Sequence, residues 1–108
     1  MMRHALFATL TLALCLAPAL AEVSKEEVKV SIDNFTFNPA VLTIKAGTSV
    51  IFENGDDIPH SIVDLEGKFH SMALDTGEKF TFVFDAAGEI NYACGLHPHM
   101  KGKIIVTP

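Results

Sequence analysis

The sequence predicts an all-β protein, an antiparallel β-sandwich with Greek-key connections. Short runs of alternating apolar and polar residues recur along the chain, and turn residues separate them. Helical periodicity is nearly absent. Several short strands at this spacing are typical of a β-sandwich.

The first 21 residues differ from the rest and are typical of a secretory signal peptide. Arg3 supplies the early positive charge, an apolar run follows, and Ala19-Leu20-Ala21 has the pattern of a cleavage site. The run is shorter than the roughly 20 apolar residues of a membrane span. A lipid anchor at Cys15 is a rival interpretation, which the bulky Leu14 disfavours. We expect cleavage after Ala21.

The remaining residues, 22–108, are predicted to form a single domain whose strands follow one another with clear breaks. The expected strands cover residues 28–32, 41–44, 48–54, 80–84, 90–94 and 101–107. Phe80, Phe82 and Phe84 fall on one face of their strand, and we expect them in the core with Ile90 and Tyr92. Tyr92 has the position of a tyrosine corner.

The net charge and the cysteine content limit the functions that the chain can have. Loss of Arg3 changes the formal net charge from −5 to −6, which makes nucleic acid an unsuitable partner. Cys94 is the one cysteine left after cleavage, so an internal disulfide is excluded. In an oxidising compartment a lone thiol is stable when it is buried, bridged to another chain or bound to a metal.

The segment from Cys94 to Met100 reads CGLHPHM and concentrates potential metal ligands. Period-two alternation through Cys94 turns the thiol inward, and His97 and Met100 follow at three and six positions. A fourth ligand has to come from elsewhere. His60, at the turn between two apolar strands, is a better candidate than His70, which we expect to be solvated.

Two imidazoles, a thiolate and a thioether indicate copper. Zinc sites use cysteine, histidine and carboxylates, and thioether is not among their usual ligands. Two histidines and a cysteine with a long axial methionine form the blue-copper site, which transfers electrons. Because the protein would fill every strong position, the set argues against an enzyme. The cofactor is predicted to be one copper ion that cycles between Cu(I) and Cu(II).

The chain resembles the cupredoxin family of type 1 (blue) copper proteins, in its plastocyanin-like group. The similarity rests on residues 35–39 (FTFNP), 59–61 (PHS) and 92–103 (YACGLHPHMKGK), and it extends over residues 28–107. The loop spacing is similar to that of the amicyanin subgroup. The resemblance implies the cupredoxin fold and one copper bound by His60, Cys94 and His97, with Met100 as axial ligand.

The resemblance also implies a periplasmic monomer that passes one electron at a time between redox proteins, with a dehydrogenase or a c-type cytochrome as donor or acceptor. Two residues depart from the family pattern. His99 replaces an aromatic residue and makes the expected docking surface more polar. Ser61 replaces an asparagine that ties the two ligand loops together, and its backbone N–H is expected to donate to the thiolate sulfur.

Other functions compete with this one. The main alternative is a periplasmic copper-binding or copper-delivery protein, although Met72 and Met100 are the only methionines after cleavage. A zinc-dependent hydrolase is a third possibility, but it needs an open metal position, which the predicted ligand set does not offer. We further expect Asp64 and Glu66 either to steer a basic partner or to form a solvated face.

Overall fold

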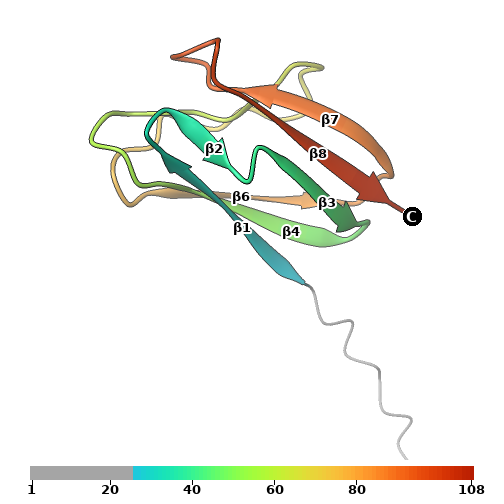
Figure 1. Cartoon of the computed structure of the whole chain (residues 1–108). Coiled ribbons are helices and arrows are strands. Elements are labelled where there is room, and N and C mark those ends of the chain that lie inside the picture. Colours follow the sequence, from blue (N-terminus) through green and yellow to red (C-terminus); the bar gives the residue numbers. More distant parts are fainter. Residues whose placement is uncertain (1–25) are drawn as a thin grey trace, which may run out of the picture.

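The computed structural model describes residues 26–108, which form a sandwich of two four-stranded sheets (Figure 1). The predicted signal peptide, residues 1–21, lies outside the described residues. The first sheet has the strand order β2-β1-β4-β6, with β1 (Glu27–Asp33), β2 (Thr36–Asn38), β4 (Thr48–Asn54) and β6 (Lys79–Phe84). The second has the order β3-β8-β7-β5, with β3 (Val41–Lys45), β5 (Val63–Asp64), β7 (Gly88–Ala93) and β8 (Lys101–Thr107).

The all-β sandwich predicted from the sequence is confirmed, with one difference in strand direction. The pairs β1–β4 and β3–β8 run parallel, whereas the other pairs of the sheets are antiparallel. The chain enters the second sheet at β3 and returns to the first at β4, so strands that are not consecutive become neighbours. No helix in the described part of the chain is long and apolar enough to cross a membrane.

The core lies between the sheets and is built from alternate residues of β1, β4, β7 and β8. Phe84, Ile90 and Tyr92 are buried as expected, but Phe80 and Phe82 are only partly buried. β6 is the outer strand of its sheet, which leaves Phe80 and Phe82 open on one side, whereas Phe84 at the end of the strand is covered.

Tyr92 packs in the core between Phe37 and Phe52, with ring centroids 4.8 and 5.3 Å from its own. Its hydroxyl has no hydrogen-bond partner among the described residues, so the tyrosine-corner expectation is wrong in that respect. Burial raises the pKa of Tyr92. Gly102 lies opposite Tyr92 on β8, and a Cβ there would overlap the phenol ring.

The strands bring three loops to one end of the sandwich: the β1–β2 turn, the β4–β5 loop and the β7–β8 loop (Figure 1). Hydrogen bonds join them, since Asp56 accepts from the backbone of Asn34 and Ser61 accepts from Gly95. The predicted metal ligands are carried by the second and third of these loops.

Gly102→Ala is expected to destabilise the metal-free protein by about 1 to 3 kcal/mol, because the new methyl group displaces the Tyr92 ring from a close-packed core. Urea unfolding measures the change. Lys101→Ala, at the exposed neighbouring position, should stay within about 0.5 kcal/mol of the parent. Equal stability of the two variants would show that the Tyr92 ring does not depend on Gly102.

Candidate metal centre

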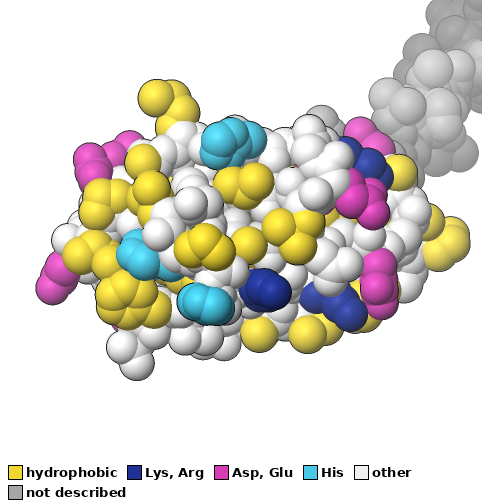
Figure 2. All heavy atoms as spheres, turned by 90° about the horizontal axis from the view of Figure 1, so that it is seen from above, with side chains coloured by type: hydrophobic (Ala, Val, Ile, Leu, Met, Phe, Trp, Pro, Cys, Tyr) yellow, Lys and Arg dark blue, Asp and Glu magenta, His cyan; other side chains and the backbone are white. Residues whose placement is uncertain are grey.

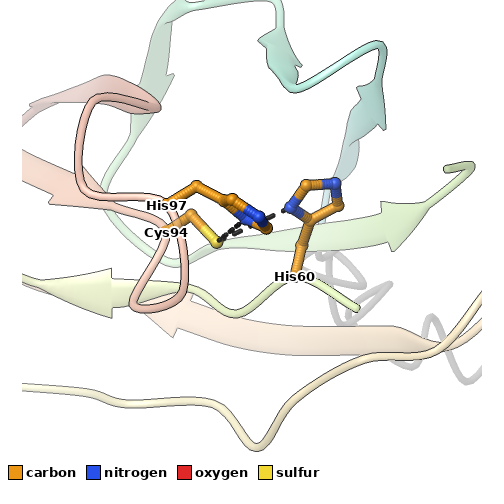
Figure 3. Close-up of side chains that lie close together, drawn as sticks. All are labelled: His60, Cys94 and His97. Atoms are coloured by element: carbon orange, nitrogen blue, oxygen red, sulfur yellow. Dashed lines mark hydrogen bonds between the residues drawn. The ribbon is translucent and has the colours of Figure 1, made fainter. Parts of the chain in front are cut away.

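The structure brings three of the four predicted ligands together. The ligand atoms of His60, Cys94 and His97 all lie within 4.8 Å of one another. The Cys94 sulfur lies 3.6 Å from Nδ1 of His60 and 3.6 Å from Nδ1 of His97. Figure 3 shows both imidazole rings turning a nitrogen toward the sulfur.

His60 is placed by the loop that follows β4 and is fully buried. Its backbone pairs with Leu74 in both directions, through N···O distances of 3.1 and 2.6 Å. Nε2 lies 2.7 Å from Oδ2 of Asp56. A ring that donates from Nε2 to a carboxylate keeps Nδ1 unprotonated, which is the form that binds a metal.

The Asp56 carboxylate is held in its charged form. Burial acts to raise the pKa of Asp56, but hydrogen bonds from the Phe35 N–H, the His60 ring and the Asn34 N–H lower it below its ordinary value overall. A negative charge beside Nε2 makes the His60 ring a stronger donor at Nδ1.

Cys94 lies just beyond the end of β7, one residue after the strand, and is 1% exposed. Its N–H donates to the Met100 carbonyl at 2.9 Å, which closes the loop on itself. The Ser61 N–H points to the Cys94 sulfur at 3.4 Å, as expected from the sequence. The Ser61 hydroxyl accepts from the Gly95 N–H at 2.9 Å, so Ser61 does connect the two ligand loops.

His97 and Met100 occupy the same short loop. The Met100 N–H donates to the His97 carbonyl at 2.9 Å. His97 is partly exposed, whereas the Met100 side chain is buried with 6% exposure. His70 is exposed and lies outside the donor cluster, so the structure favours His60 over His70 as the histidine from outside the loop.

Two residues at the site were not identified from the sequence as functional. Phe35 lies edge-on to both imidazoles, with ring centroids 5.5 Å from His60 and 5.2 Å from His97. Asp56 contacts His60 from the side away from the sulfur. A carboxylate four positions before a predicted ligand was the available signal for Asp56, but acidic residues are common in loops.

The donor set fits a metal ion. Metal bonds of about 2.0 to 2.3 Å that open at roughly 120° place two donors roughly 3.5 to 4 Å apart. The observed 3.6 Å distances agree with this range. Among the described residues, no carboxylate joins the cluster, and two nitrogens with one thiolate match the strong ligands of a blue-copper site.

Comparisons with known proteins agree with the donor set. The sequence model of the family described as "Cupredoxin-like domain" matches residues 4–106. Amicyanin from Paracoccus versutus is 32% identical over 93 residues, which cover 82% of this chain and 70% of the relative. Chloroplastic plastocyanin from Tetradesmus obliquus is 38% identical over 94 residues, which cover 73% of this chain and 65% of the relative.

Among solved structures, a copper-containing nitrite reductase from Thermus scotoductus superposes with a TM-score of 0.72 and 33% identity. The match covers 76% of this chain but 22% of that enzyme. The similarity therefore concerns one part of a much longer protein.

Ser61→Ala should weaken the connection between the ligand loops, because the Gly95 N–H loses its side-chain acceptor. We expect the metal-free protein to lose about 0.5 to 1.5 kcal/mol of stability and the loaded protein to release copper faster. Urea unfolding and transfer of copper to a chelator measure the two effects. Ser49→Ala, near the start of β4, is the control and should release copper at the parent rate. Equal release rates for both variants would contradict the role of Ser61.

Proposed function

The chain belongs to the cupredoxin-like family, and we propose that it carries one electron at a time between redox proteins, with a single copper bound by His60, Cys94, His97 and axial Met100. Amicyanin and plastocyanin are electron-transfer cupredoxins. Family members bind one copper ion, which supplies one-electron chemistry by cycling between Cu(I) and Cu(II).

The observation that carries this proposal is the enclosed donor cluster. His60 and Cys94 are fully buried, and each is hydrogen-bonded to a separate segment: the His60 backbone to Leu74 and the Cys94 sulfur to the Ser61 N–H. The Met100 side chain is buried at the end of the same loop as Cys94. Such a site suits electron transfer better than catalysis, because the four proposed ligands all come from the protein and would leave no position for a substrate.

His97 gives the centre its contact with the surface. It is the partly exposed member of the cluster, and it lies between the exposed Leu96 and Pro98. Figure 2 shows histidine and hydrophobic side chains together on one face of the molecule. We infer that a partner docks over the surface formed by Leu96, His97 and Pro98 and exchanges an electron through His97.

The proposed setting is the periplasm, reached through the cleavable signal peptide of residues 1–21, with a dehydrogenase or a c-type cytochrome as partner of the monomer. Steering of a basic partner by Asp64 stays a prediction, but the Asp64 carboxylate is not accessible for direct contact with that partner. Asp64 is 3% exposed, and its carboxylate accepts from the backbone N–H groups of Glu66 and Lys68, both at 3.0 Å. Glu66 is exposed and remains available to a basic partner.

Copper delivery is the second candidate. Met72 favours it, because its thioether is 86% exposed and a soft surface ligand attracts Cu(I). The buried positions of His60 and Cys94 oppose it, since delivery needs ligands that exchange readily with a partner.

Cys94→Ser is expected to abolish the intense visible absorption of the copper-loaded protein, because the thiolate is the source of the charge-transfer band. Metal analysis, the absorption spectrum and voltammetry of the mature protein test the proposal, which expects one copper per chain and reversible one-electron cycling. His70→Ala is the control and should keep the colour. An unchanged band in Cys94→Ser would refute the ligand assignment, and a colourless, rapidly exchanging copper(I) site would favour delivery.

Met100→Leu should raise the reduction potential while copper stays bound, because loss of a thioether donor disfavours Cu(II) more than Cu(I). Voltammetry measures the shift. Met72→Leu makes the same chemical change at an exposed position and should leave the potential unchanged. A lower potential in Met100→Leu would count against axial coordination.

A further inference from the structure

The turn between β1 and β2 has an unfavourable backbone conformation. Asn34 and Phe35 have φ angles of 51° and 57°, in the left-handed region. Asparagine tolerates this region, but it is unusual for a bulky side chain such as phenylalanine. The turn therefore needs contacts from the surrounding structure to hold it.

Burial of the Phe35 side chain does not explain the conformation, because that side chain is 52% exposed. The ring instead lies edge-on to both His60 and His97, at centroid distances of 5.5 and 5.2 Å. The strained turn places an aromatic ring against the two imidazoles of the metal centre.

Asp56 supplies the contacts that hold the turn. Its Oδ1 accepts from the Asn34 N–H at 2.6 Å, and its Oδ2 accepts from the Phe35 N–H at 2.9 Å. The same Oδ2 lies 2.7 Å from Nε2 of His60. One carboxylate thus connects the turn that carries Phe35 to the imidazole that Phe35 contacts.

Three hydrogen bonds hold the backbone of Asp56 and of the preceding Gly55. Its N–H donates to the side-chain oxygen of Asn54 at 2.9 Å, and its carbonyl accepts from the Thr76 hydroxyl at 2.5 Å. The preceding Gly55 N–H donates to the Ile32 carbonyl at 2.7 Å, at the end of β1. The Asp56 side chain is 12% exposed, so its carboxylate has little freedom to turn toward solvent.

We propose that Asp56 is a positioning residue that fixes the His60 and Phe35 rings together, so that Phe35 forms a lid that keeps small ligands away from the two imidazoles. The proposal rests on the proposed function in one respect, since it takes His60 and His97 as copper ligands. Without the Asp56 contacts, the left-handed turn relaxes, the Phe35 ring moves off the imidazoles, and the centre opens to small molecules.

The first test follows the turn in the metal-free protein and needs no copper. Hydrogen exchange of the Asn34 and Phe35 amides, measured by NMR, should be at least tenfold faster in Asp56→Asn than in the parent, because a neutral amide cannot replace all three contacts of the carboxylate. Asp57→Asn removes the same charge from the exposed neighbouring residue and should leave both amides unchanged. Exchange in the β-strands reports whether each variant is folded.

The second test measures azide binding to the Cu(II)-loaded protein. Asp56→Asn and Phe35→Gly should each lower the azide dissociation constant at least tenfold, and the double variant should bind no tighter than the tighter single variant, because both changes remove one lid. Loss of a negative charge by itself favours binding of an anion such as azide. Asp57→Asn controls for this effect and should change the azide dissociation constant less than twofold.

Unchanged exchange at Asn34 and Phe35 in Asp56→Asn would overturn the proposal. So would faster exchange with an azide affinity equal to that of Asp57→Asn, since Asp56 would then hold the turn without forming a lid. The first test remains valid if the chain binds no copper, so failure of the lid and failure of the copper assignment give different results.

Discussion

The metal centre depends on the close approach of two loops that belong to different sheets. His60 follows β4 of the first sheet, whereas Cys94 and His97 follow β7 of the second. Ser61 connects the two loops. Its N–H donates to the Cys94 sulfur, and its hydroxyl accepts from the Gly95 N–H. A Cβ at Gly95 would lie 2.7 Å from the Ser61 oxygen, so glycine is required for the contact.

Polar side chains in the loops extend this connection beyond the ligands. Asn54 is fully buried and donates to the carbonyls of Ile58 and Leu74, at 2.8 Å each. Leu74 pairs in turn with the His60 backbone. Because buried polar groups are costly unless they are paired, a fully bonded asparagine favours one loop conformation over others. Hydrogen bonds between protein groups outside the donor cluster therefore support the ligand geometry.

The sequence was sufficient for the fold class, six of the eight strands and the residues of the donor cluster, because these depend on local patterns. Alternation identified the longer strands, and the Cys94–Met100 segment contains its ligands at close spacing. The short strands β2 and β5 were missed, since three and two residues carry no detectable alternation. The parallel pairing of β1 with β4 depends on contacts between distant segments, which local patterns do not contain.

Asp56 and Asp64 show that composition alone does not predict which acidic side chains are exposed to solvent. Both count toward the negative net charge; Asp56 lies in the β4–β5 loop and Asp64 ends the two-residue strand β5, and acidic residues in such a sequence context are usually solvated. In the structure each carboxylate accepts two backbone N–H groups and is largely buried. Their charges still add to the long-range field that acts on a partner, but their oxygens are already bonded within the protein. These oxygens are therefore not free to contact the proposed partner, whereas the partly exposed His97 and the exposed Leu96 and Pro98 lie at the surface next to the centre.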